Sequence, residues 1–190
     1  EAALPPSGSP ALFRSLEIRF PTQGNVPTVE IATYLYYMEV DDEVSLPSQQ
    51  RWTPFDAALE TLLLEDFERL WATDFLNDIA IEIVDDPYPN GVEGRRVIFL
   101  LEERERVRIV TFNGSDAYDR TEIDEAMDSV GIELRLDTRV NPGVIRTTEG
   151  LLRQMWAEKG YEFAEISHEL EPLPGGPKMV ELRFEIDQGP

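Results

Sequence analysis

The chain has 190 residues, an ordinary apolar content of 42% and a formal net charge of −21. A field of that sign repels phosphate backbones and anionic lipid surfaces, so nucleic acid is not an expected partner. Because cysteine is absent, disulfides, thiolate metal sites and cysteine nucleophiles are excluded.

The first residues of the chain are rich in proline, serine and glycine, and residues 1–11 are predicted to form a flexible lead-in. The chain starts at Glu1 without a methionine. We interpret this start as a processed or truncated N-terminus whose targeting segment has been removed.

The first half of the chain predicts a strand, two helices and two further strands. Leu16, Ile18 and Phe20 alternate with polar residues in the first strand, Ser15–Phe20, and a short helix is expected over Val29–Met38. Thr53-Pro54 is expected to open the second helix. The closing strands, Asp78–Asp85 and Arg96–Glu103, flank a Pro/Gly-rich turn.

The second half predicts the same order. The strand Arg106–Phe112 precedes a helix capped by Asp119, and Asn141-Pro142 starts a second helix. Strands Tyr161–Leu170 and Met179–Asp187 follow. Each half is therefore a β-α-α-β-β unit.

The two halves are also similar in sequence. Matches recur at a constant spacing of 85 residues: Trp71-Ala72 with Trp156-Ala157, Ile81 with Ile166, Phe99 with Phe184, and Leu101 with Ile186. The first copy carries about seven extra residues near 40–51. We therefore predict two domains, 12–104 and 105–190. Tandem copies usually build an extended binding surface, which argues against a single catalytic pocket.

The predicted architecture is α+β, with a three-stranded mixed sheet and two helices on one face in each domain. The last two strands form a hairpin, and the first strand pairs most easily in parallel with the third. The second strand is then left as an edge with free backbone groups.

Four segments resemble POTRA domains, the polypeptide-transport-associated modules, and among these the periplasmic part of a BamA-type outer-membrane protein assembly factor. They are the helix-to-strand junction Phe67–Ile79, the first strand and turn Arg106–Gly114, the helix end Lys159-Gly160-Tyr161, and the closing Phe184–Pro190. Asp74 stands where the family usually has glycine, although aspartate tolerates the left-handed conformation. The insert before Arg51 is also atypical.

The resemblance implies the first two POTRA domains of a longer protein in the periplasm, part of an outer-membrane protein of a Gram-negative-type bacterium. The implied role is non-enzymatic, with no cofactor and no metal. The implied partners are unfolded outer-membrane β-barrel proteins, accessory assembly lipoproteins or periplasmic chaperones, and the barrel domain of the same full-length protein.

In that role the domains would bind extended polypeptide by β-augmentation, in which backbone hydrogen bonds to an exposed strand edge supply the affinity. The candidate edge residues are Ile79, Ala80, Ile81, Glu82, Ile83 and Val84 in the first domain, and Glu162, Phe163, Ala164, Glu165 and Ile166 in the second. The alternative is that glutamates such as Glu82, Glu162 and Glu165 simply blunt these edges.

Two further groups of residues are candidates for binding. Ile98 and Leu100 form an apolar outer face of the first sheet, unless another part of the chain covers them. Tyr34, Tyr36, Tyr37 and Met38 form either an aromatic binding patch or, as is more common, a mixture of core and cover. His168, the one histidine, is expected to be structural, because no second histidine or cysteine completes a triad.

Three rival functions remain open at this point. The same modules occur in secretion or translocation transporters of the barrel superfamily. A structural spacer or self-association module would show no affinity for unfolded clients. An enzyme is the third alternative, but no acid–base pair in a plausible cleft supports it.

Overall fold

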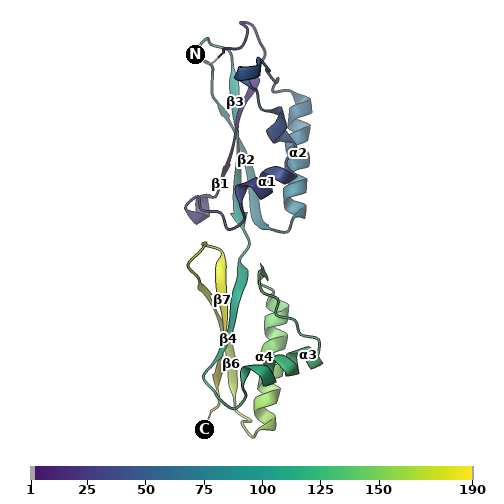
Figure 1. Ribbon diagram of the computed structural model, residues 1–190, viewed down its shortest axis with the longest axis vertical. Helices are drawn as coiled ribbons and strands as arrows, with labels where there is room; N and C mark the ends of the chain where they lie inside the picture. The colour runs from purple at the N-terminus through teal and green to yellow at the C-terminus, as the bar shows by residue number, and fades with distance from the viewer. Residues whose placement is uncertain (1–2, 190) are drawn as a thin grey trace. The chain divides into compact units, whose positions relative to one another are not determined.

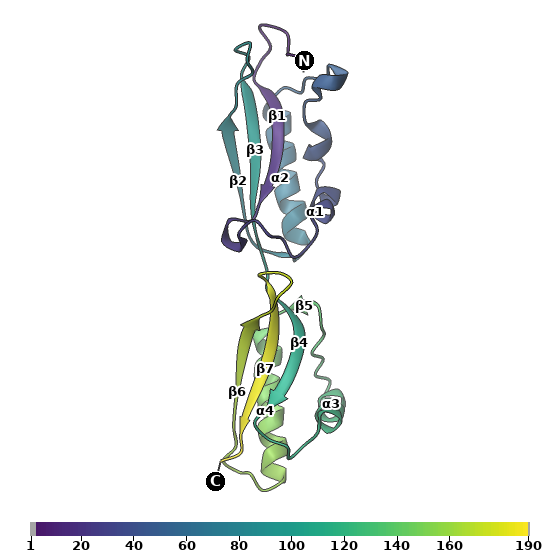
Figure 2. The same cartoon turned by 60° about the vertical axis from the view of Figure 1, so that its left-hand side comes forward.

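The computed structural model describes residues 3–189, and the chain divides into two compact units, Glu1–Glu103 and Arg104–Pro190. Each unit is a mixed sheet with helices on one face (Figures 1 and 2). None of the described helices is both long and apolar enough to cross a membrane.

The elements follow the predicted order in both units. Unit 1 contains β1 (Leu12–Arg19), η1 (Pro21–Gln23), α1 (Ile31–Tyr37), η2 (Val40–Glu43), η3 (Pro47–Gln49), α2 (Ala57–Ala72), β2 (Leu76–Asp85) and β3 (Gly94–Glu103). Unit 2 contains β4 (Arg106–Asn113), α3 (Arg120–Ser129), β5 (Thr138–Arg139), α4 (Pro142–Glu158), β6 (Glu165–Pro172) and β7 (Met179–Asp187).

The sheet topology confirms the predicted α+β class and pairing. The strand order is β1-β3-β2 in unit 1 and β5-β4-β7-β6 in unit 2, with β1/β3 and β4/β7 parallel. The second sheet has a fourth strand that was not expected, because β5 adds the pairs Arg106–Arg139 and Val107–Thr138. Two residues are too few to show an alternating pattern, so the sequence carried no signal for β5.

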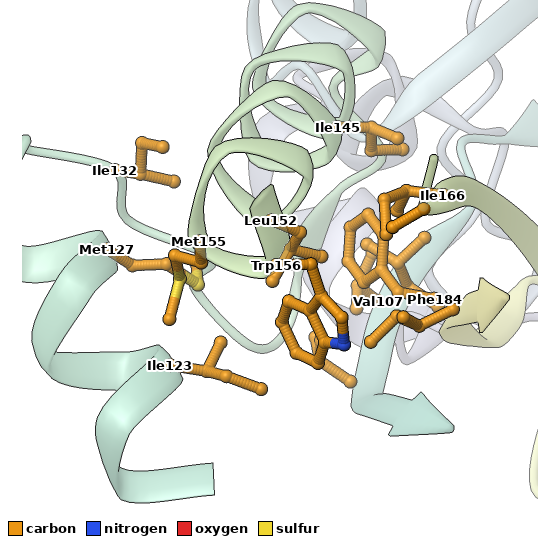
Figure 3. Packing of buried hydrophobic residues seen from close by; sticks show 14 of the residues in the cluster. Val107, Ile123, Met127, Ile132, Ile145, Leu152, Met155, Trp156, Ile166 and Phe184 are labelled. Atoms are coloured by element: carbon orange, nitrogen blue, oxygen red, sulfur yellow. The ribbon is translucent and has the colours of Figure 1, made fainter. Parts of the chain in front are cut away.

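Each unit has its own apolar core between sheet and helices. In unit 1, Phe13, Tyr34, Leu70 and Phe99 are among the fully buried side chains. In unit 2, Trp156 lies at the centre, packed among Ile123, Met155 and Phe184 (Figure 3). The predicted cap of α3 is confirmed, since the Asp119 carboxylate accepts from Glu122 N at 2.9 Å.

The constant spacing of 85 residues holds for the central strands but not for the rest of the repeat. Phe99 and Phe184 are both buried on parallel-paired strands. On the helices, however, the buried counterpart of Trp156 is Leu70, 86 residues earlier, while Trp71 is 47% exposed. The expectation that Trp71 is equivalent to Trp156 is therefore wrong.

The hairpins show a second offset. Phe99 faces Ile81 across the sheet, whereas Phe184 faces His168 rather than Ile166. The structural counterpart of Ile81 is therefore His168, and the matched pair Ile81–Ile166 is wrong by two residues. A side-chain period of two on a strand allows such a shift without changing which face is buried.

The start of α2 also differs from the prediction. Asp56 caps it, and its carboxylate accepts from Leu59 N at 3.0 Å. Thr53 and Pro54 instead run along β1, where Thr53 O accepts from Phe13 N at 2.8 Å. The Asn141-Pro142 start of α4 is confirmed.

The insert and the lead-in both pack on unit 1. Ser45 N donates to Phe13 O at 3.0 Å, so the insert covers the first part of the β1 edge. Asn90 Nδ2 donates to Pro5 O at 2.8 Å, so the described part of the lead-in, expected to be flexible, lies on the β2–β3 turn. Residues 1–2 lie outside the described residues.

A buried aspartate holds the insert on α2. Both Asp66 carboxylate oxygens accept backbone N–H groups, from Glu39 and Val40, each at 2.9 Å, and Arg69 Nε donates to Asp66 at 3.1 Å. The position 86 residues later is the buried Leu152. The second copy has no such insert and therefore no backbone donors to satisfy, which explains the apolar residue there.

We expect Asp66→Asn to lower the free energy of unfolding by about 2–3 kcal/mol, because an amide N–H₂ would face a backbone N–H donor and leave it unsatisfied. Urea unfolding measures this change. Glu65→Gln, on the exposed side of the same helix, is the matched control and should change stability by less than about 0.5 kcal/mol. Equal effects would show that Asp66 does not hold the insert.

A second buried carboxylate lies at the end of β3. Glu103 accepts from Thr28 N at 2.6 Å, from Val29 N at 2.8 Å and from Tyr34 Oη at 2.6 Å. Gln23 bonds it twice, its Nε2 donating to the carboxylate and its Oε1 accepting from Glu103 N. One side chain therefore positions the whole segment between η1 and α1.

Candidate polypeptide-binding edges

The β2 strand places Ile79–Val84 along the edge of the first sheet. β2 pairs with β3 on one side, and the strand order leaves its other side at the sheet boundary. Ile83 is 49% exposed and Val84 is also exposed, whereas Ile79 is buried in the core. The edge thus combines backbone groups at the sheet boundary with apolar side chains accessible to a partner.

The second candidate edge is partly wrong. Glu162, Phe163 and Ala164 lie in the turn between α4 and β6, and the strand begins only at Glu165. The helix end forces this turn, because Gly160 adopts a positive φ of 96° and Tyr161 N donates back to Trp156 O. The β6 edge of the second sheet is therefore Glu165–Pro172, of which Glu165 and Ile166 were predicted.

An apolar stripe on α2 accompanies the β2 edge. Leu64, Phe67 and Trp71 follow one another at helical spacing, and Leu64 is 64% exposed. The rings of Phe67 and Trp71 are stacked, with centroids 6.4 Å apart. The sequence pattern had placed Phe67 and Trp71 on the buried side of this helix and did not single out Leu64, so the stripe was not predicted.

The stripe lies on the side of α2 where β2 forms the edge. The opposite flank of α2, at Asp66 and Arg69, contacts Glu39 and Val40. Figure 2 shows α1 on the β1 side of the unit and β2 on the other. Beside β6 in unit 2, the corresponding α4 positions are Gly150, Arg153 and Ala157. The apolar flank is thus a property of unit 1.

The outer face of the first sheet is less open than expected. Ile98 lies across from Glu17 and Glu82 and is only 4% exposed, although Leu100 is half-buried. Arg96, on the same face, pairs with Glu17 at 3.2 Å. Charged side chains therefore border Ile98, which offers little surface to a partner, and contact at Leu100 stays a prediction.

The tyrosine cluster divides between core and surface. Tyr34 and Met38 are buried, while Tyr36 is strongly exposed and Tyr37 is exposed to a lesser degree. His168 is exposed on β6, with Nδ1 2.6 Å from Glu149 Oε1 on α4. Within residues 3–189, no group of three His, Cys, Asp or Glu side chains is arranged to hold a metal ion.

Searches for similar proteins found solved structures but no family model and no curated protein that matches the chain. POTRA3-5 of BamA from Haemophilus influenzae is 17% identical, with 99% of this chain and 70% of that one covered and a TM-score of 0.39. POTRA1-2 of Omp85 from Anabaena is 16% identical, with 96% and 98% covered and a TM-score of 0.35.

The N-terminal domain of Omp85 from Thermosynechococcus elongatus is 14% identical, with 94% of this chain covered and a TM-score of 0.37. The chain spans 63% of the length of that domain. All three are parts of Omp85 or BamA proteins, the group that the sequence motifs resemble. Identities this low do not assign a function.

Proposed function

We propose that the chain is a pair of POTRA domains that binds unfolded outer-membrane β-barrel precursors in the periplasm, as part of an outer-membrane assembly protein. The β2 edge of unit 1 carries this proposal. It lies at the boundary of its sheet, and exposed Ile83 and Val84 accompany its backbone groups. An added strand would gain backbone hydrogen bonds from such an edge without needing a particular sequence.

The α2 stripe makes unit 1 the favoured client site. An added strand on β2 would bring alternate side chains over Leu64, Phe67 and Trp71, which supply apolar area to bury. The edge at Glu165–Pro172 has no equivalent flank, and Glu165, Glu169 and Glu171 lie along it. Charged side chains on an edge strand disfavour the addition of another strand. Accessory factors would then bind elsewhere on the pair.

An NMR titration of the labelled chain with a ten-residue peptide of alternating apolar and polar residues tests this site. We expect chemical-shift changes concentrated at Ile79–Val84. The same peptide with every second backbone amide N-methylated should not bind, because augmentation depends on backbone hydrogen bonds. The double variant Leu64→Ser/Trp71→Ser should weaken the peptide about tenfold.

The matched control is Leu136→Ser in unit 2, an exposed leucine outside β2 and β6, which should leave the affinity unchanged. Equal binding of the N-methylated peptide would contradict β-augmentation. An absence of shifts at millimolar peptide would contradict client binding altogether and favour a structural spacer.

A further inference from the structure

One tyrosine of α1 has almost its whole side chain exposed to solvent. Tyr36 is 83% exposed. Its ring stands edge-to-face on Tyr37 at 5.4 Å between centroids, and Tyr37 stands in the same way on Phe75 at 6.3 Å. Phe75 in turn contacts Tyr34 in the core. The four rings form an aromatic ladder from solvent to core.

Hydrogen bonds to a buried carboxylate hold the inner end of the ladder in place. Tyr34, at its inner end, donates its hydroxyl to the buried Glu103, which also accepts the N–H groups of Thr28 and Val29 just before α1. A helix pinned at its start and on its inner face holds Tyr36 in place before any partner arrives. A preorganised aromatic side chain loses little conformational entropy on binding.

The segment that carries most of the ladder is acidic. Residues 20–50 contain three tyrosines, five carboxylates and no lysine or arginine, the carboxylates being Glu30, Glu39, Asp41, Asp42 and Glu43. Arg51 and Arg69 reach this segment from outside. Arg51 donates to the carbonyls of Asp42 and Val44, and Arg69 is paired with Asp66 and Glu39.

We propose that α1 and η2 form a docking surface, defined by Tyr36, Tyr37 and Asp41–Glu43, for a folded protein partner whose own surface carries clustered lysine or arginine around an apolar residue. Cations pack on tyrosine faces and pair with the surrounding carboxylates, and tyrosine is a frequent binding hot spot. This proposal rests on the proposed function. It names the surface at which an accessory factor would dock and the kind of side chains that the factor would present.

The partner is a folded protein rather than an extended client. The surface presents side chains of a helix and a 3-10 helix, whose backbone groups bond within the segment, as in Thr33 N to Glu30 O and Met38 N to Leu35 O. It therefore lacks the open backbone that an added strand needs. This separates it from the β2 edge, whose affinity would come from the backbone.

A designed helical miniprotein that presents three arginines around one leucine serves as the probe. NMR titration of the labelled chain should shift Tyr36, Tyr37 and Asp41–Glu43 and leave Ile79–Val84 unchanged. Tyr36→Ala should weaken the probe at least about tenfold. The triple variant Asp41→Asn/Asp42→Asn/Glu43→Gln should weaken it by a similar factor and make the affinity less dependent on salt, because the ionic contacts that salt screens are then gone.

Matched controls separate this surface from general attraction to an acidic chain. Phe163→Ala removes another strongly exposed aromatic ring, and Asp116→Asn/Glu125→Gln/Asp128→Asn removes the same charge from unit 2. Both should leave the affinity within about twofold. Equal losses in the control triple would overturn the proposal in favour of non-specific attraction.

Two other results would also overturn it. Binding of the unfolded strand peptide at Tyr36 would make this surface part of the client site. A concentration-dependent mass that Tyr36→Ala abolishes would identify the occupant as a second copy of the chain. Neither result depends on shifts at the β2 edge, so failure here and failure of client binding are distinguishable.

Discussion

Replacing Trp156 with alanine is expected to destabilise unit 2 by about 3–5 kcal/mol, the usual cost of emptying a large buried aromatic site. Trp156 is fully buried, its ring lies 5.0 Å from that of Tyr118, and its Nε1 donates to Ser115 Oγ at 2.8 Å. The variant loses this packing and leaves a cavity between α4 and the sheet. Urea unfolding, followed by NMR signals assigned to each unit, measures the change.

The control is Trp71→Ala, the same substitution at the matching point of the sequence repeat. Because about half of Trp71 is exposed to solvent, this variant loses less buried apolar area. The free energy of unfolding of unit 1 should therefore fall by only about 1 kcal/mol. If the two variants destabilised their units equally, Trp71 would be the counterpart of Trp156 after all, and the assignment of Leu70 to that position would be wrong.

Replacing Glu103 with glutamine is expected to destabilise unit 1 by about 3 kcal/mol. The carboxylate is buried and accepts from Thr28 N, Val29 N and Tyr34 Oη. Glutamine keeps the shape but turns one acceptor into a donor that faces other donors. At least one buried N–H or O–H group is then left unsatisfied.

The same variant should change the NMR signals of α1, because Glu103 fixes the segment that leads into it. Glu82→Gln, an exposed position on β2, is the control and should be close to neutral. Equal stability of Glu103→Gln and the parent chain would show that the buried network contributes little to folding.

Local rules predicted the features that depend on neighbouring residues. Asp119 and Asn141 cap their helices as expected, because an N-cap needs only a side-chain acceptor and the next turn. Asp74 adopts a φ of +63°, as expected for an aspartate at a position where the family has glycine. The edge position of β2 was also predicted from connectivity, since β2 and β3 form a hairpin and β1 was expected to pair in parallel with β3.

Long-range packing produced the features that were missed. The roles of Asp66 and Glu103 depend on backbone donors 26 to 75 residues away, and a charged residue in a helix or strand gives no local sign of burial. The exposure of Trp71 and Leu64 has the same origin. A helix with apolar residues on two adjacent faces can bury either one; in α2 the insert contacts the flank at Asp66, and Leu64 and Trp71 stay exposed.

The sequence by itself determined the element order, the two units, the parallel pairing and the β2 edge, because these follow from periodicity, capping and chain connectivity. The tertiary structure alone decided which apolar side chains remain exposed: the α2 stripe beside that edge and Tyr36 on α1. Exposure depends on what packs against each face, and the segments that pack in unit 1 are held by buried carboxylates whose partners lie far away in the chain.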